Sequence, residues 1–211
     1  MITLGVDDPA ALAAAAKALG RGGLVLVPTD TVYGLAVRPG DEEAVGRLFQ
    51  AKDRPVERKI PVLAASIEQV EELGVDFNKP ARELAGRYWP GALTLAFSFS
   101  ELRRRPDWLV GREEVAVRVP DLGFLRRLMT ETGVLLVTSA NAHGEATPPD
   151  AGDAAASLLE PVDVVVDAGP LAGRPSTLVN VAVSPPVVER PGPLPVGELR
   201  SLGLVVPAGP E

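Results

Sequence analysis

Cysteine is absent from this chain of 211 residues, and histidine occurs only once. The first absence excludes a thiol nucleophile, disulfide bonds and thiolate metal ligands, and a single histidine excludes a multi-histidine metal centre. No apolar run approaches the roughly 18 residues of a membrane-spanning helix. The amino terminus also lacks the basic stretch and apolar core of a secretory signal. We therefore expect a cytoplasmic protein that has no membrane partner.

Positive charge is in the minority, because 28 acidic residues outnumber 21 basic ones and give a net charge of -7. This balance argues against a protein that is wrapped broadly in nucleic acid. A few well-placed Arg and Lys side chains can nevertheless form a local anion site. The sequence contains neither of the common glycine-rich phosphate loops, Gly-x-x-x-x-Gly-Lys-Ser/Thr and Gly-x-Gly-x-x-Gly. Any nucleotide must therefore be bound without them.

Short apolar runs alternate with helical patterns along the whole chain, which is 46% hydrophobic. This alternation predicts an α/β fold with a mixed sheet. No repeat or shift in composition marks a linker, so we expect one domain over residues 1–211. The predicted strands cover residues 24–27, 60–64, 92–99, 115–120, 134–137, 162–166, 177–183 and 187–190. The predicted helices begin at Asp8, Asp41, Ser66, Asn78, Leu122, Asp150 and Pro195, and residues 101–113 are predicted to form an exposed loop.

The stretch from Leu24 to Val37 carries the strongest local signal. Its first four residues are apolar and predict a strand buried on both faces, which Pro28 ends because proline has no N–H to donate. Two threonines, an aspartate and a tyrosine follow directly. Open α/β sheets bind ligands at the ends of such strands. The same residue types also form ordinary solvated turns, and spacing alone leaves both interpretations open.

Basic residues occupy two positions that suit an anion. Lys52 and Arg54 lie at the end of a predicted helix, where they could bind phosphate or simply complement the helix dipole. Arg118 lies near the end of an apolar strand. A guanidinium buried there needs an anionic partner, which could be a structural carboxylate or that of a ligand.

Polar residues also follow the predicted strand 134–137. Ser139 and Asn141 could bind a phosphate or a base through a hydroxyl, an amide and backbone N–H groups. A turn or a helix cap would use the same residues. A hydrolase that pairs Ser139 with His143 lacks the Gly-x-Ser-x-Gly elbow and is not supported.

Seven short motifs occur in a characteristic order, and together they span nearly the whole chain. They are Pro28-Thr29-Asp30-Thr31-Val32-Tyr33-Gly34-Leu35, Lys52-x-Arg54-Pro55, Trp89-Pro90-Gly91-x-Leu93-Thr94, Val117-Arg118-Val119-Pro120, Ser139-x-Asn141, Ser176-Thr177 and Arg190-Pro191-Gly192. Each motif alone is weak, but the ordered set is specific. The sequence resembles the YrdC-like family of L-threonylcarbamoyladenylate synthases.

This resemblance implies a single YrdC-like domain with a twisted mixed sheet, flanking helices and a concave basic pocket. It implies a nucleotidyltransferase that condenses L-threonine, bicarbonate and ATP into threonylcarbamoyl-AMP and releases pyrophosphate, with Mg2+ on the ATP. The product would serve the threonylcarbamoyladenosine modification of tRNA. The expected partners are separate threonylcarbamoyl-transfer proteins. Weak binding of RNA is also expected.

The resemblance also implies residue roles. Lys52 and Arg54 would grip the triphosphate as the catalytic cations, and no protein metal ligand is expected. The nucleotide would be held by these two residues and by Ser139, Asn141, Thr147 and Arg190. L-threonine would be held by Thr29, Arg118 and Ser176, with Arg118 on its carboxylate.

The sequence departs from the family pattern in three places. Asp30 replaces the usual glutamate, the basic segment with Arg58 and Lys59 follows the pattern only loosely, and the chain ends at Glu211 without the extra domain of longer members. We therefore expect the short form. Two alternatives remain, a non-catalytic RNA-binding module and a carbamoyl-transfer domain of the hydrogenase-maturation type. The second alternative normally belongs to a longer chain with zinc-finger-like cysteines.

Overall fold

The computed structural model describes residues 1–53, 55, 60–142, 144–171 and 173–207. In these residues the strands form one ten-stranded sheet with the order β1-β8-β2-β3-β7-β4-β6-β5-β9-β10. The strands are β1 (Ile2–Gly5), β2 (Val25–Val27), β3 (Gly34–Val37), β4 (Val62–Leu63), β5 (Leu93–Ser98), β6 (Glu114–Arg118), β7 (Leu135–Ser139), β8 (Val164–Asp167), β9 (Thr177–Asn180) and β10 (Val187–Arg190). The helices are α1 (Ala11–Leu19), α2 (Glu42–Ala51), α3 (Ile67–Glu71), α4 (Lys79–Tyr88), α5 (Gly123–Thr132), α6 (Ala151–Ala156) and α7 (Val196–Ser201).

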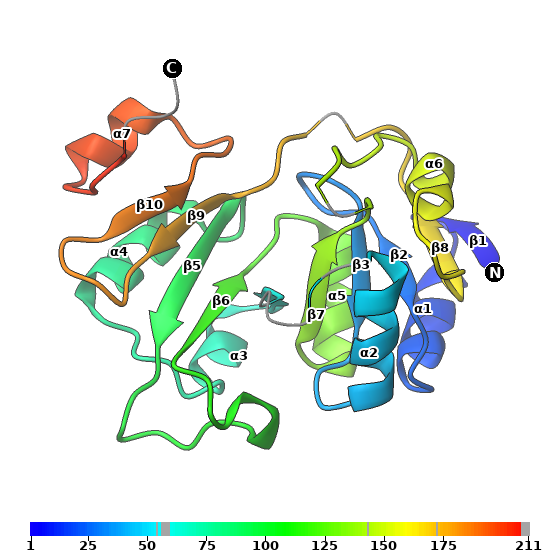
Figure 1. Cartoon of the computed structure of the whole chain (residues 1–211), viewed down its shortest axis with the longest axis horizontal. Helices are drawn as coiled ribbons and strands as arrows, with labels where there is room; N and C mark the ends of the chain where they lie inside the picture. Colours follow the sequence, from blue (N-terminus) through cyan, green and yellow to red (C-terminus); the bar gives the residue numbers. More distant parts are fainter. Residues whose placement is uncertain (54, 56–59, 143, 172, 208–211) are drawn as a thin grey trace.

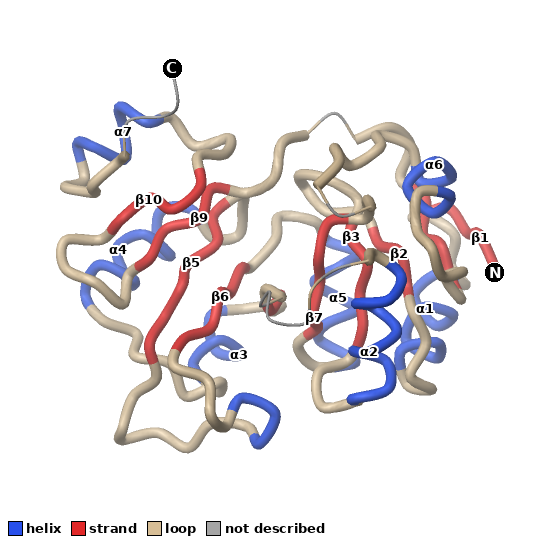
Figure 2. The backbone as a smooth tube through the Cα atoms, viewed as in Figure 1, coloured by secondary structure: helices blue, strands red, loops and turns tan. Residues whose placement is uncertain are grey.

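The sheet is mixed and twisted, as the sequence predicts. Strands β1, β8, β2, β3 and β7 lie with α1, α2, α5 and α6 in one half of the molecule (Figure 1). Strands β6, β5, β9 and β10 lie with α3, α4 and α7 in the other half (Figure 2). The two-residue strand β4 joins the halves, because it pairs antiparallel with β7 and parallel with β6. No helix in the described part of the chain is long and apolar enough to span a membrane.

Strand β2 is buried on both faces, which confirms the interpretation of its unbroken apolar run. Leu24 and Leu26 belong to one hydrophobic cluster, whereas Val25 and Val27 belong to a second cluster on the other face. The first cluster includes residues of α2 and α4, and the second includes residues of α1 and α5. A strand of alternating orientation must be apolar throughout when helices cover both of its faces.

Three of the seven predicted helix starts, Asp41, Ser66 and Asn78, are confirmed by side-chain capping contacts. The side chain of Asp41 accepts a hydrogen bond from the backbone N–H of Ala44 at 3.0 Å, as an N-cap does. The prediction for the first helix was wrong, because α1 starts at Ala11 and its cap residue is Ala10. The Asp8 carboxylate instead accepts a hydrogen bond from the Ala10 N–H within the preceding turn.

Strand β1 was not predicted, and neither was β3 as a separate strand. β1 is an edge strand that pairs parallel with β8, and three of its four residues are exposed. A short exposed strand lacks the apolar alternation from which half-buried strands are recognised. β3 forms the antiparallel partner of β2 directly after the polar residues that follow Pro28.

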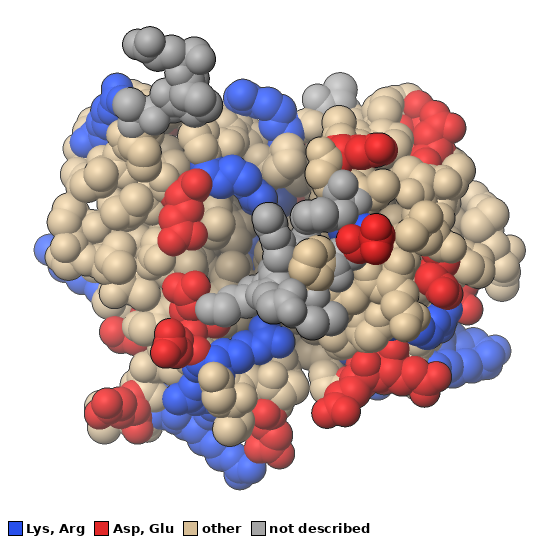
Figure 3. Space-filling model, in the orientation of Figure 1, with Lys and Arg blue, Asp and Glu red and all other residues tan. Residues whose placement is uncertain are grey.

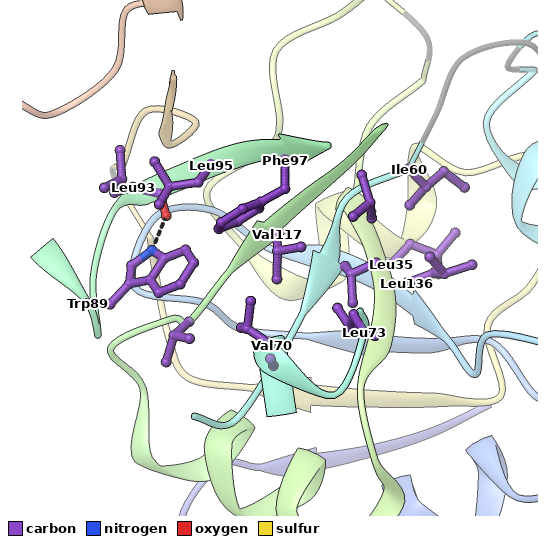
Figure 4. Packing of buried hydrophobic residues seen from close by; sticks show 14 of the residues in the cluster. Leu35, Ile60, Val70, Leu73, Trp89, Leu93, Leu95, Phe97, Val117 and Leu136 are labelled. Atoms are coloured by element: carbon purple, nitrogen blue, oxygen red, sulfur yellow. Dashed lines mark hydrogen bonds between the residues drawn. The ribbon is translucent and has the colours of Figure 1, made fainter. Parts of the chain in front are cut away.

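The core beneath β5 is built around aromatic rings. The rings of Phe77 and Phe97 stack with centroids 5.5 Å apart, and Trp89 lies 6.3 Å from Phe97. The indole N–H of Trp89 donates to the Leu93 carbonyl at 2.7 Å (Figure 4). Leu93, Leu95 and Phe97 share this face of β5, so Thr94 and Ala96 point to the opposite face.

We expect Asn78→Ala to lower the free energy of unfolding by about 1–2 kcal/mol, because Asn78 caps α4. Its side-chain oxygen accepts from the Ala81 N–H at 3.0 Å, and its amide donates to the Val181 carbonyl at 2.7 Å. Asn78→Ser keeps a capping oxygen and loses only the second bond, so it should be less destabilising than Asn78→Ala. Urea denaturation of both variants measures the difference, and equal losses would contradict the capping role.

Candidate functional site

A pocket of about 370 Å³ opens on the face of the sheet opposite the aromatic core. Residues of β6, β5, β9 and β10 form its floor, and the loop after β2, the end of β7 and Pro175 form its walls. Figure 3 shows basic and acidic side chains gathered around the hollow between the two halves. The polar lining residues are Thr29, Thr31, Tyr33, Thr94, Glu114, Arg118, Thr138, Ser139, Ser176, Glu189 and Arg190.

The floor places two arginines in one row across four strands. Leu95 pairs with Val117 between β5 and β6, and the same register sets Thr94 opposite Arg118. Thr94 pairs with Leu178 of β9, and Leu178 pairs with Arg190 of β10. The next row along β5 and β6 holds Ala96 opposite Ala116, whose small side chains leave the pocket open.

A β-bulge in β10 turns Arg190 toward the pocket. Val188 pairs with Val179 and Arg190 with Leu178, so Glu189 is an extra residue with no partner position on β9. Successive strand residues normally point to opposite faces, but a bulge allows both to share one face. Glu189 and Arg190 accordingly both line the pocket. The Asn180 amide donates to the Glu189 carboxylate at 2.8 Å and ties the bulge to β9.

Arg118 is the buried arginine that its apolar strand predicts, with 5% of its surface exposed. Its guanidinium donates to the Gly91 carbonyl at 2.9 Å, to Thr31 Oγ1 at 2.9 Å and to Asp30 Oδ1 at 2.5 Å. Desolvation lowers the pKa of Arg118, and the neighbouring Asp30 carboxylate opposes that shift. The structural ion pair considered from the sequence is therefore present, and Arg118 also lines the pocket.

Arg190 and Ser176 lie together at the other end of the row. The guanidinium of Arg190 donates to the Ser176 carbonyl at 2.9 Å and to Ser176 Oγ at 3.3 Å. Ser176 Oγ lies 2.7 Å from Thr94 Oγ1. The pKa of Arg190 is lowered by desolvation and, secondarily, by repulsion from the charge of Arg118. The guanidiniums of Arg118 and Arg190 therefore line the same pocket.

The loop after β2 is both a turn and a wall of the pocket. Thr29 Oγ1 donates to the Val32 carbonyl at 2.7 Å and accepts from the backbone N–H of Thr31 at 3.0 Å. The segment before Ser176 packs closely against this loop, because a Cβ on Gly173 would lie 1.8 Å from the Thr31 carbonyl oxygen. Only glycine fits that approach. The segment after Pro28 is therefore a turn, but its threonines are buried rather than solvated, and they line the pocket.

Lys52 reaches the loop after β7 from the end of α2. Only 1% of its surface is exposed, and its ammonium donates to the carbonyls of Ser139 and Asn141 and, at 3.1 Å, to Asn141 Oδ1. These contacts differ from the alternative considered from the sequence, in which Lys52 simply complements the dipole of its own helix. The side-chain amide of Asn141 donates to the Glu145 carbonyl at 2.6 Å, so Asn141 also organises this loop.

The predicted site residues thus fall into three groups. Thr29, Arg118, Ser139, Ser176 and Arg190 line the one pocket. Lys52, Asn141 and Thr147 are not among its lining residues in the part of the chain that the structure describes. Three cations considered from the sequence, Arg54, Arg58 and Lys59, lie outside the described residues, as does His143.

Sequence reasoning missed four polar residues of the pocket, which are Thr94, Thr138, Glu114 and Glu189. Glu114 could have been found, because it precedes Arg118 by four residues on a strand and therefore shares its face. Glu189 could not, because its orientation depends on the bulge. Within the described ranges, no group of three or more His, Asp or Glu residues could hold a metal ion.

The fold and the pocket define an α/β protein whose pocket is lined by arginines, hydroxyls and two glutamates. The model of the Sua5/YciO/YrdC family, described as "Telomere recombination", matches residues 17–192. The chain belongs to this family.

Several relatives resemble the chain over most of its length. The threonylcarbamoyl-AMP synthase of Pyrococcus abyssi is 36% identical over 89% of this chain and 56% of the relative. A putative threonylcarbamoyl-AMP synthase of Mycobacterium leprae is 36% identical over 93% of this chain and 90% of the relative. The crystal structure of P. abyssi Sua5 complexed with L-threonine matches with a TM-score of 0.85 and 33% identity, over 97% of this chain and 61% of that one. The chain spans little more than half the length of the first curated relatives it matches.

We expect Lys52→Met to lower the free energy of unfolding by about 1–3 kcal/mol without any ligand, because it removes one buried donor from three acceptors of the β7 loop. Lys79→Met is the matched control, since the Lys79 side chain is 87% exposed and pairs with Glu83 on its own helix. Chemical denaturation measures both variants. If Lys52→Met were as stable as Lys79→Met, the loop-holding role would be refuted.

Proposed function

We propose that this chain is an L-threonylcarbamoyladenylate synthase, a nucleotidyltransferase that makes threonylcarbamoyl-AMP and pyrophosphate from L-threonine, bicarbonate and ATP. The observation that carries the proposal is the row of Arg118, Thr94 and Arg190 on the floor of one pocket. All three substrates bring anionic oxygens to the enzyme. A pocket with two guanidiniums and several buried hydroxyls suits such groups. The curated names of the relatives in this family support the same reaction.

The reaction needs alignment more than acid–base chemistry. The threonine amine attacks the bicarbonate carbon, so that a C–N bond forms and water leaves, giving a carbamate. A carbamate oxygen then attacks the α-phosphorus of ATP, and the bond to pyrophosphate breaks. A carbamate is a weak nucleophile, so positioning and charge neutralisation supply most of the acceleration. A site that has no cysteine can do both.

The proposed residue roles follow the position of each side chain. Arg118 and Thr29 would hold L-threonine together with Ser176, and Arg118 would bind its carboxylate. Arg190 and Ser139 would contact the nucleotide. Lys52 would act from the end of α2, Asn141 and Thr147 from the loop after β7, and Arg54 from the segment after α2. ATP would enter as its Mg2+ complex, and the metal on the phosphates would favour departure of pyrophosphate.

The product is a mixed anhydride, so a group-transfer reaction must consume it. We propose threonylcarbamoyl-transfer proteins of tRNA modification as partners.

The two alternative functions predict different behaviour. An RNA-binding module would bind RNA tightly and salt-sensitively without ATP. A carbamoyl-transfer domain would use carbamoyl donors in place of L-threonine and bicarbonate.

The direct test measures pyrophosphate release from MgATP while L-threonine or bicarbonate is omitted in turn. We expect release only in the complete mixture, with threonylcarbamoyl-AMP detected there by mass spectrometry. Release without L-threonine, or no adduct in the complete mixture, would refute the proposed reaction.

We further expect Arg118→Ala to weaken L-threonine binding by about tenfold or more, because a charge-assisted hydrogen bond contributes about 1.5–3 kcal/mol. ATP binding should change little. Arg126→Ala is the matched control, since Arg126 also donates to a backbone carbonyl but lies away from the pocket. Calorimetric titration of both ligands decides the assignment, which an unaltered threonine affinity would exclude.

A further inference from the structure

The proposed function requires a bicarbonate site, and no residue has yet been assigned to it. Thr94 on the floor of the pocket has no assigned role, and its hydroxyl is paired with that of Ser176. Thr94 is 3% exposed and Ser176 is 6% exposed, and both line the pocket. The following argument rests on the proposed function, because it locates one substrate of that reaction.

The row of the floor places Thr94 between the two arginines. Arg118, Thr94, Leu178 and Arg190 occupy neighbouring strands in that order. Adjacent strands lie about 4.8 Å apart, so the backbones that carry the two arginines are separated by roughly 14 Å. The hydroxyl pair lies within this interval, since Ser176 Oγ is 2.7 Å from Thr94 Oγ1.

The hydroxyl pair has an unused hydrogen-bond donor. Two hydroxyls carry two hydrogens, and the bond between Thr94 and Ser176 uses only one of them. Arg190 donates to Ser176 Oγ, which uses an acceptor position and no hydrogen. Whichever hydroxyl donates within the pair, the hydrogen of the other has no acceptor among the residues that the structure describes. This donor faces a pocket rather than a packed core.

In the row of the floor that holds the hydroxyl pair, the charged side chains are the two arginines; Glu114 lies two rows away, opposite Ser98, and the Glu189 carboxylate accepts from the Asn180 amide. Desolvation lowers the pKa of Arg190, and the like charge of Arg118 across the pocket lowers it further. Arg190 uses its Nε and Nη2 groups for Ser176, and its Nη1 group bonds no residue in the described ranges. A small oxyanion between the arginines would relieve the repulsion and accept from both the hydroxyl and the guanidinium.

The reaction places bicarbonate in the same position. The bicarbonate carbon must lie beside the amine of a threonine that Arg118 holds by its carboxylate. The resulting carbamate oxygen must then reach the α-phosphorus of a nucleotide that Arg190 contacts. An anion that reacts first with one ligand and then with the other belongs between them. Ala96 and Ala116 in the adjacent row leave room for it.

We propose that Thr94 is a bicarbonate-binding residue, whose hydroxyl, set by Ser176, holds the anion between Arg118 and Arg190. The bicarbonate would lie over the β5–β9 part of the floor. Its oxygens would accept from the free hydroxyl hydrogen and from the Nη1 group of Arg190. Thr94 would thus determine the affinity for the smallest of the three substrates.

The test measures initial rates of pyrophosphate release against bicarbonate concentration in carbon dioxide-depleted buffer, with MgATP and L-threonine saturating. Thr94→Val removes the hydroxyl and keeps the shape of the side chain. We expect it to raise the bicarbonate KM about tenfold or more, while the KM values for L-threonine and ATP stay within about twofold. Thr94→Ser keeps a hydroxyl and should restore a bicarbonate KM close to that of the unmodified chain.

The outcomes separate this proposal from the proposed function. If the unmodified chain shows no bicarbonate-dependent pyrophosphate release, the proposed function fails. If it does, but Thr94→Val leaves the bicarbonate KM unchanged or raises the threonine KM equally, the bicarbonate site at Thr94 is refuted. Thermal unfolding checks the fold of each variant. Thr94→Ala replaces Thr94→Val if valine disturbs it, because alanine already occupies the adjacent floor positions 96 and 116.

Discussion

The buried guanidinium of Arg118 is the interaction on which the pocket depends. It lies on β6 in one half of the molecule and bonds Asp30 and Thr31 of the loop after β2 in the other half. The sheet itself joins the halves only through the two residues of β4. Burying an unpaired guanidinium would cost several kcal/mol. The fold therefore tolerates Arg118 only while the loop stays in place, and the loop wall of the pocket is fixed by this requirement.

The remaining geometry follows from the alternation of side chains along the strands. On β5, Leu93, Leu95 and Phe97 enter the aromatic core, so Thr94 and Ala96 must face the pocket. The same period places Arg118, Ala116 and Glu114 on the pocket face of β6. One face of this part of the sheet thus provides stability, and the other face keeps small and polar side chains. Shifting a strand by one residue would exchange the side chains of the two faces, because successive residues point to opposite sides of the sheet.

The sequence predicted those features that depend on local pattern. The buried strand before Pro28, the buried Arg118 and the capped helix at Asp41 all follow from the order of apolar and polar residues. Contacts between distant segments could not be read in this way. The pair of Asp30 and Arg118 joins residues 88 positions apart, and the target of Lys52 depends on where β7 ends. The orientation of Arg190 depends on one extra residue in β10. The order of apolar and polar residues does not reveal that residue.

The pocket also reconciles a net charge of -7 with a proposed set of anionic substrates. Affinity for a small oxyanion depends on the charges and donors within a few ångströms, because solvent and salt screen the more distant ones. Arg118 is buried and Arg190 is exposed, but both line one pocket, in which hydroxyls supply further donors and Glu114 and Glu189 supply acceptors. Extended polyanions meet the acidic exterior instead. Two arginines in one row of the pocket can therefore serve a small oxyanion, although the chain as a whole is acidic.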